Sequence, residues 1–221
     1  HESGAGFMAL ADARLTHCPG IVLVSRGPGA CNAAIAVHTA QQDAVPLLLI
    51  VGQVEARDLR LRAFQEIDYS RMFDGIAKFV GEATTAAQVP ELLARAWAAM
   101  LIGVPGPAVL ALPQDVLTLP CPTPALAAVT LADAAPSPQA ADQLAELLRS
   151  AERPILLAGG DLDRPGGRES LRQIAEAWQL PVAVGFRRQD LFPNSHPLYA
   201  GDMGLANPPA QRAAFAAADL V

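Results

Sequence analysis

Short runs of apolar residues, bounded by glycine and proline, alternate along the chain with longer segments of helical period. Continuous apolar runs are typical of parallel strands that are buried on both faces, and helices are the usual connections between such strands. The pattern therefore predicts an α/β fold. The predicted strands cover Ile21–Ser25, Pro46–Val51, Ala77–Val80, Pro107–Leu112, Pro154–Ala158 and Pro181–Val184.

Two segments, Gln88–Ile102 and Gln139–Ser150, show the helical period most clearly. In the second segment, Leu144 and Leu147 recur at the spacing that places them on one side of a helix. Each of these helices is expected to have one apolar face to bury. Two further helices are expected, one at the start of the chain and one that begins near Ala30.

The composition changes between residues 117 and 138 to proline, threonine, alanine and leucine, with no helical or alternating stripe. This segment reads as a proline-stiffened linker, and the alternative is a long surface excursion inside one domain. We therefore expect one α/β unit over residues 1–116 and another over residues 139–221. Neither shows a full set of strands, so both domains are expected to be incomplete parts of a longer polypeptide.

The composition argues against several classes of protein. A chain with 52% hydrophobic and 17% charged residues is not expected to be disordered, and a formal charge of −6 argues against a nucleic-acid partner. The longest apolar runs, such as Val45–Val51, fall short of the roughly 20 residues needed to span a bilayer, so no membrane partner is expected. Cys18, Cys31 and Cys121 lack CxxC spacing, which favours neither a disulfide framework nor zinc and fits a cytoplasmic protein.

The first segment with possible chemistry is HESGAGFMA, in which Glu2 is followed by small residues. Small residues let another backbone or a flat ligand come close to the carboxylate. The alternative is an acidic helical turn, favoured by the dipole of the helix. This motif taken alone favours the alternative.

The second candidate is SRGPGACN, which follows an apolar strand and precedes a helix. A glycine-rich turn at the carboxyl end of a parallel strand is where such folds bind ligands, because N–H groups at the start of the helix face outward. It is neither GxGxxG nor a P-loop, which disfavours dinucleotide or nucleoside triphosphate binding. A purely structural turn is the alternative. The candidate ligand residues here are Gly27, Pro28, Gly29 and Asn32.

The third candidate is AFQEID, in the polar stretch that follows the second predicted strand. Phe64 could pack on a ligand and Gln65 could hydrogen-bond to one, since long loops beyond a strand often line a site. Glu66 and Asp68 could equally be solvated.

Other candidates are weaker. Gly159 and Gly160 repeat the strand-then-glycine arrangement without a partner motif. His38 and His196 have no metal-binding companions, so both are interpreted as structural and no metal ligand is assigned. A GxSxG nucleophile motif is absent from the sequence.

Seven motifs, taken in order, resemble the thiamine diphosphate-dependent enzymes of the acetohydroxyacid (acetolactate) synthase, pyruvate oxidase and benzoylformate decarboxylase superfamily. The resemblance implies two doubly wound, mostly parallel three-layer units: a pyrimidine-binding domain in residues 1–116 and a Rossmann-like central domain in residues 139–221. The motifs are HESGAGFMA, IVLVSRGPGACN, PLLLIVGQ, AFQEID, GPAVLALPQDV, RPILLAGG and HPLYAGDMG.

The same resemblance implies a role for each candidate. Glu2 matches a catalytic glutamate that hydrogen-bonds to N1′ of the aminopyrimidine, which lets the 4′-imino nitrogen remove the C2 proton of the thiazolium. To share a proton with that nitrogen, its carboxyl group should be desolvated and its pKa raised. Cys31 stands where the family more often has threonine. The implied cofactor-binding residues are Gly27, Pro28, Gly29, Asn32 and Gln65, and those on the substrate side are Phe64 and Gln65.

For the protein as a whole, the resemblance implies decarboxylation of a 2-oxo acid such as pyruvate and transfer of the resulting unit. Mg²⁺ would be held by a diphosphate-binding domain absent from this sequence, so this segment alone is expected to be inactive. The site would lie between subunits, which implies a homodimer or homotetramer. Whether the central domain binds FAD stays open, because Arg187 and Arg188 could pair with a pyrophosphate or lie in a solvated turn. Alternatives are an aldehyde lyase or acyl-CoA-type decarboxylase on the same scaffold, a non-catalytic nucleotide-binding module, or a structural or regulatory domain.

Overall fold

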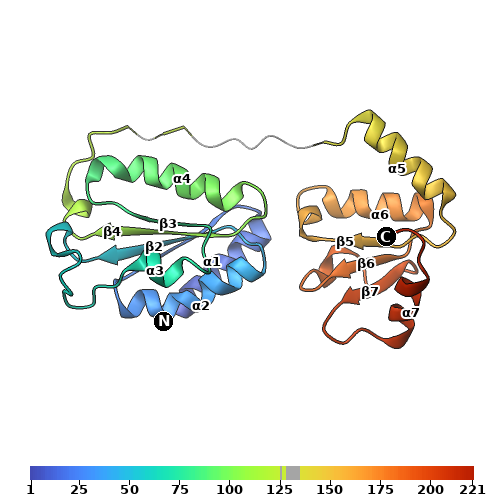
Figure 1. The fold of residues 1–221 in the computed structure, drawn as a ribbon, viewed down its shortest axis with the longest axis horizontal. Helices are drawn as coiled ribbons and strands as arrows, with labels where there is room; N and C mark the ends of the chain where they lie inside the picture. Colours follow the sequence, from blue (N-terminus) through green and yellow to red (C-terminus); the bar gives the residue numbers. More distant parts are fainter. Residues whose placement is uncertain (125, 128–134) are drawn as a thin grey trace. The chain divides into compact units, whose positions relative to one another are not determined.

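The computed structural model describes residues 1–124, 126–127 and 135–221 (Figure 1). The chain divides into two compact units, His1–Ala132 and Asp133–Val221. The division lies within the segment predicted as a linker. Residues 125 and 128–134 of that segment lie outside the described residues. Within the described ranges, no helix has both the length and the apolar character needed to cross a membrane.

The first unit is built on a four-stranded parallel sheet with the strand order β1-β2-β4-β3. The predicted α/β class is therefore confirmed. The β3 strand begins two residues later than predicted, because Lys78 still belongs to the loop, where its Nζ donates to two backbone carbonyls. The strands are β1 (Gly20–Val24), β2 (Leu47–Gln53), β3 (Phe79–Glu82) and β4 (Pro107–Pro113).

Helices cover both faces of this sheet, which gives three layers (Figure 1). Leu47 and Leu49 of β2 face one helical layer and Leu48 faces the other, as expected for alternating side chains of a strand. Every residue of β4 is buried, because that strand lies between two others and under both layers. The helices of one layer are α1 (Glu2–Thr16), α2 (Pro28–Gln42) and α3 (Tyr69–Phe73), and the opposite face carries α4 (Val89–Leu101).

The second unit has a three-stranded parallel sheet in the order β5-β6-β7. Leu220 adds one parallel bridge to Pro154, next to β5. The sequence analysis missed β7, α6 and α7; β7 reads YAGDM and has no apolar run. The elements are α5 (Pro138–Ser150), β5 (Leu156–Ala158), α6 (Gly167–Trp178), β6 (Val182–Gly185), β7 (Tyr199–Met203) and α7 (Pro209–Ala217).

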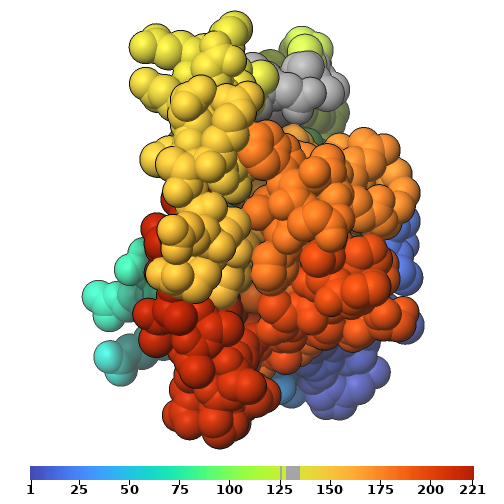
Figure 2. All heavy atoms as spheres, turned by 90° about the vertical axis from the view of Figure 1, so that its right-hand side faces the viewer, coloured from blue at the N-terminus to red at the C-terminus, as the bar shows by residue number. Residues whose placement is uncertain are grey.

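The α5 helix differs from the expectation. Its apolar face was expected to be buried, but Leu144 and Leu147 are 54% and 53% exposed. Arg149 lies over the ring of Trp178 on α6, with its guanidinium carbon 6.0 Å from the ring centre. Figure 2 shows the atoms of α5, in yellow, on the surface of the second unit. Within the described residues, this helix therefore does not contribute to the core.

Candidate functional site

Polar side chains gather where the parallel strands of the first sheet end. All four strands run in one direction, so the loops that follow them meet at the same edge. The turn after β1 lies beside the loop after β2, and Arg26 in the first donates to Gln114 after β4 at 3.4 Å. The predicted ligand residues lie in these loops and at the start of α1.

Glu2 is held beside the glycine turn. Its Oε2 accepts a hydrogen bond from Nδ2 of Asn32 at 3.0 Å, and the hydroxyl of Ser3 donates to the carbonyl of Asn32 at 2.9 Å. A Cβ atom on Gly29 would lie 3.5 Å from Oε1 of Glu2. The structure therefore brings Glu2, Gly29 and Asn32 together, although they come from two different helices.

The close packing of α1 on α2 places Glu2 there. A Cβ atom on Gly6 would lie only 2.5 Å from the Cβ of Ala36, so a glycine is needed at this position for the two helices to approach. Gly6 of HESGAGFMA thus has a structural purpose that also helps to position the carboxylate.

The ionisation of Glu2 differs from the expectation. The carboxyl group was expected to be desolvated with a raised pKa. In this chain it is partly exposed, and its pKa is lowered, first by a hydrogen bond from its own backbone N–H and then by the side chain of Asn32. Donors around a carboxylate stabilise its charged form, so the group is ionised at neutral pH in this chain.

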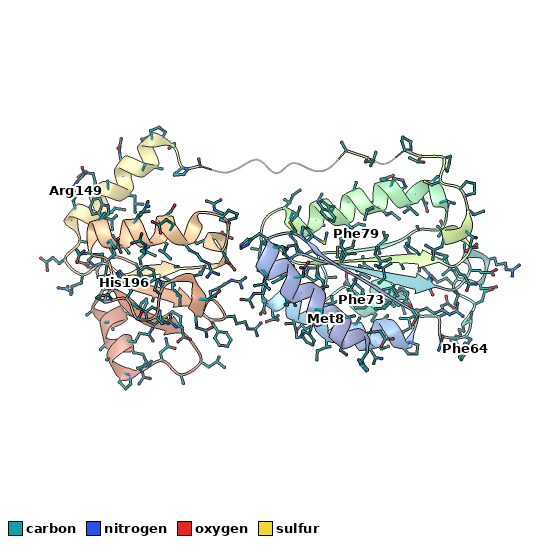
Figure 3. All side chains as sticks on the ribbon, turned by 180° about the vertical axis from the view of Figure 1, so that it is seen from behind. Met8, Phe64, Phe73, Phe79, Arg149 and His196 are labelled. Carbon is teal, nitrogen blue, oxygen red and sulfur yellow. The ribbon has the colours of Figure 1, made fainter. Side chains whose placement is uncertain are left out.

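Gln65 packs on the other side of the glycine turn. Gly27 has φ of +60°, and a Cβ atom there would lie 2.8 Å from the Cβ of Gln65 and 2.9 Å from its carbonyl oxygen. Gln65 itself has a positive φ of 64°. Phe64 points away from the core and is 80% exposed, at the outer tip of the loop (Figure 3). The structure thus joins Gln65 to the turn and leaves Phe64 in solvent.

Tyr69 is a residue of this site that the sequence analysis missed. Its hydroxyl accepts a hydrogen bond from the backbone N–H of Gly27 at 3.0 Å and donates one to the carbonyl of Gly52 at 3.3 Å. Burial raises the pKa of Tyr69, so the hydroxyl keeps its proton. The only signal in the sequence was its position directly after AFQEID.

Glu66 and Asp68 are partly exposed to solvent and also make structural contacts within the loop. Glu66 accepts hydrogen bonds from the backbone N–H groups of Arg60 and Ala63, and the first of these is the main cause of its lowered pKa. Asp68 caps α3 by accepting from the N–H of Arg71 at 3.3 Å. These contacts close the loop that carries Gln65.

An ion pair fastens the same loop to the end of β3. Arg60 donates to Oε1 of Glu82 at 2.9 Å, and Nε2 of the buried Gln53 donates to Oε2 of Glu82 at 3.2 Å. Sequence analysis missed this network, because Glu82 lies 22 and 29 positions from its two partners in the chain.

The glycine turn of the second unit is arranged differently. A Cβ atom on Gly160 would lie 3.0 Å from Nε of Arg188, whose residue is only 8% exposed. Arg188 therefore packs beneath this turn, which overturns the solvated-turn alternative for it. His38 lies in α2. His196 contacts Glu176 at 3.3 Å, and its ring lies 5.0 Å from that of Phe192 in a T-shaped arrangement, in keeping with a structural role.

Both units of the chain match models of known protein families. Residues 1–72 match the family model described as "Thiamine pyrophosphate enzyme, N-terminal TPP binding domain", and residues 141–221 match "Thiamine pyrophosphate enzyme, central domain". The chain belongs to the thiamine diphosphate-dependent enzymes. The first match contains Glu2, the glycine turn, Gln65 and Tyr69, so the site described above lies in a thiamine diphosphate-binding domain.

The similar proteins of this enzyme family are much longer than this chain. The chain is 32% identical to the acetolactate synthase isozyme 1 large subunit of Escherichia coli (strain K12), over 93% of the chain and 36% of that protein. It is 32% identical to the acetolactate synthase large subunit of Lactococcus lactis subsp. lactis (strain IL1403), over 100% of the chain and 39% of that protein. The sulfoacetaldehyde acetyltransferase of Alcaligenes xylosoxydans xylosoxydans is 31% identical, over 100% of the chain and 36% of the relative. The chain thus spans well under half the length of the curated relatives it matches.

Proposed function

We propose that this chain supplies the pyrimidine-binding side of a thiamine diphosphate site, in an enzyme that decarboxylates a 2-oxo acid such as pyruvate and transfers the remaining unit. The observation that carries the proposal is the carboxylate of Glu2, held by Asn32 at 3.0 Å beside a turn that has no side chain at Gly29. The match to an N-terminal thiamine pyrophosphate-binding domain over residues 1–72 supports it.

The residues present fit one part of the cofactor. An aminopyrimidine ring is flat and carries a ring nitrogen that pairs with a carboxyl group, and the small residues around Glu2 allow such a ring to approach closely. The start of α2 favours the same edge for a polar ligand, because N–H groups at a helix N-terminus face outward. Among the described residues, no group of three histidine, cysteine, aspartate or glutamate side chains is placed to hold a metal ion. The proposal assigns Mg²⁺ to a diphosphate-binding domain outside this sequence.

Each residue then has a separate task. Bound thiamine diphosphate supplies the nucleophilic carbon that adds to the carbonyl of the substrate. Glu2 holds a proton between its carboxylate and the ring nitrogen, and this requires the bound ring to cover a group whose pKa is now lowered by its donors. Gly27 and Gly29 let Gln65 and Ser25 pack against the turn that receives the ring, while Gln65 and Phe64 face the substrate side.

The partners are part of the proposal. We expect a homodimer or homotetramer in the cytoplasm, because in this enzyme family the diphosphate-binding domain of a second subunit completes the site. A second candidate is transfer of the unit from or to an aldehyde. The match to a sulfoacetaldehyde acetyltransferase, at nearly the same identity as the acetolactate synthases, favours this candidate.

Titration of thiamine diphosphate with Mg²⁺ into the full-length protein tests the proposal. We expect saturable binding, followed by a thiamine-dependent product from pyruvate. Supplying pyruvate with and without a second 2-oxo acid or an aldehyde then separates ligation from simple decarboxylation. Absence of saturable binding would refute the proposal and favour a non-catalytic module.

A further inference from the structure

One buried hydroxyl ties the glycine turn to the sheet. Tyr69 is 1% exposed, and its oxygen joins backbone groups of two different segments, the N–H of Gly27 and the carbonyl of Gly52. Gly52 belongs to β2, which is fixed by the parallel ladder on both sides. The hydroxyl therefore transfers the rigidity of the sheet to the turn.

The turn depends on this contact because few other bonds hold it. Gly27 adopts φ of 60° and ψ of −110°, a conformation that residues with a side chain rarely adopt. Pro28 follows and has no N–H to donate. Gly27 is also buried, so without Tyr69 its N–H would lack an acceptor, at a cost in free energy. The carbonyl of Gly27 in turn accepts from the N–H of Cys31 at 3.0 Å and so begins α2.

The segment that carries Tyr69 also packs against Gly27 through a second residue. Gln65, four residues earlier, packs within 2.8 Å of where a Cβ of Gly27 would be. Asp68 caps α3 and thereby fixes the residue next to it, since its Oδ1 accepts from Ser70 at 2.9 Å and from the N–H of Arg71 at 3.3 Å. Residues 65–69 and Gly27 thus form one unit, and a shift of Tyr69 would move the turn and Gln65 together.

We infer that Tyr69 is a positioning residue, whose hydroxyl holds the glycine turn in the conformation that receives the pyrimidine half of thiamine diphosphate. This inference rests on the proposed function. Tyr69 itself need not touch the cofactor. It acts through Gly27, and its effect is to remove the free-energy cost of ordering the turn when the cofactor binds.

The test compares Tyr69→Phe with Phe73→Leu in the full-length protein. Both residues lie in α3, both are buried, and their rings are 6.3 Å apart, but phenylalanine has no hydroxyl that could hydrogen-bond to the turn as Tyr69 does. Both variants are expected to lower Tm. Only Tyr69→Phe is expected to raise the Kd of thiamine diphosphate, on the order of tenfold, because the relaxed turn must be reordered on binding. Its kcat at saturating cofactor should fall much less than its cofactor affinity.

Hydrogen exchange of the Gly27 amide, measured without cofactor, tests the hydrogen bond independently. The Gly27 amide should exchange faster in Tyr69→Phe than in Phe73→Leu when each is compared with wild type. A Kd within twofold of wild type, an equal rise in both variants, or equal exchange of the amide would overturn the inference. Failure of the wild-type protein to bind thiamine diphosphate would instead overturn the proposed function, and the positioning role would fall with it.

Discussion

The two units place glycines at the same point of a parallel sheet and use them differently. In the first unit, Gly27 has a positive φ and leads into the 15-residue helix α2, with Glu2 facing the turn. In the second unit, Gly159 has φ of −112° and ψ of −177° and leads into a single 3₁₀ turn, while Arg188 packs against Gly160. A strand followed by glycine is therefore not enough to indicate a ligand site. The positive φ, the long helix and the facing carboxylate distinguish the first turn from the second.

The largest expected effect comes from neutralising the carboxylate of Glu2, which faces the turn of the first unit. Glu2→Gln in the full-length protein is expected to lower kcat by about 10²- to 10⁴-fold, the usual value of general acid–base catalysis. The Kd of thiamine diphosphate should change much less, because glutamine keeps the size and can still accept from Asn32. Steady-state kinetics and cofactor titration measure the two effects separately.

Glu146→Gln is the matched control in the second unit. Glu146 lies on α5, where it pairs with the exposed Arg149 at 2.8 Å, so kcat and cofactor affinity should stay within twofold of wild type. Wild-type turnover by Glu2→Gln would remove the mechanistic distinction between the two units.

Much of this architecture could be predicted from the sequence. The apolar runs of β2 and β4 are buried on both faces, and such strands look alike in any parallel sheet, so their pattern was sufficient. The β7 strand was missed because each of its residues is only partly buried and the segment contains glycine and aspartate. The apolar stripe of α5 predicted a helix correctly but not its surroundings, since periodicity reports a face and not what covers it.

The candidate site was predictable residue by residue but not as a network. Glu2, the turn and Gln65 stood in recognisable motifs. Tyr69 did not, because its importance comes from a hydrogen bond to Gly27, 42 positions away. Arg188 was named only as a pyrophosphate partner or a solvated residue, because its packing against Gly160 depends on the fold. The lowered pKa of Glu2 in this chain was not predicted for a related reason, since its donors, Asn32 and its own backbone N–H, are set by how α1 meets α2.

A smaller effect is expected from replacing one glycine of each turn by alanine, which adds a single methyl group. Gly27→Ala forces a strained φ and places a Cβ 2.9 Å from the carbonyl oxygen of Gln65, so the free energy of unfolding should fall by about 1–3 kcal/mol. Cofactor affinity should fall with it. A Cβ on Gly159 would meet nothing within 4 Å, and Gly159→Ala should therefore change stability by less than about 0.5 kcal/mol. Urea unfolding of the two variants measures both values, and equal losses would mean that the turns are alike.

The smallest expected effect is on the pH dependence of stability, because the carboxylates involved are exposed to water. In the first unit the pKa of Glu66 is lowered, mainly by the N–H of Arg60, and in the second the pKa of Asp219 is lowered by the N–H groups of Glu152 and Arg153. A carboxyl group whose pKa is lower in the folded state stabilises the fold fully above its unfolded pKa, about 4.3 for Glu and 3.9 for Asp, and this contribution disappears as the pH falls through the folded pKa. Glu66→Gln and Asp219→Asn should therefore each lower Tm at pH 7, with a difference from wild type that shrinks toward pH 3. Hydrogen exchange should locate the first effect in residues 60–66 and the second around residues 152–153. A Tm difference that is independent of pH would show that these carboxylates contribute through packing and not through charge.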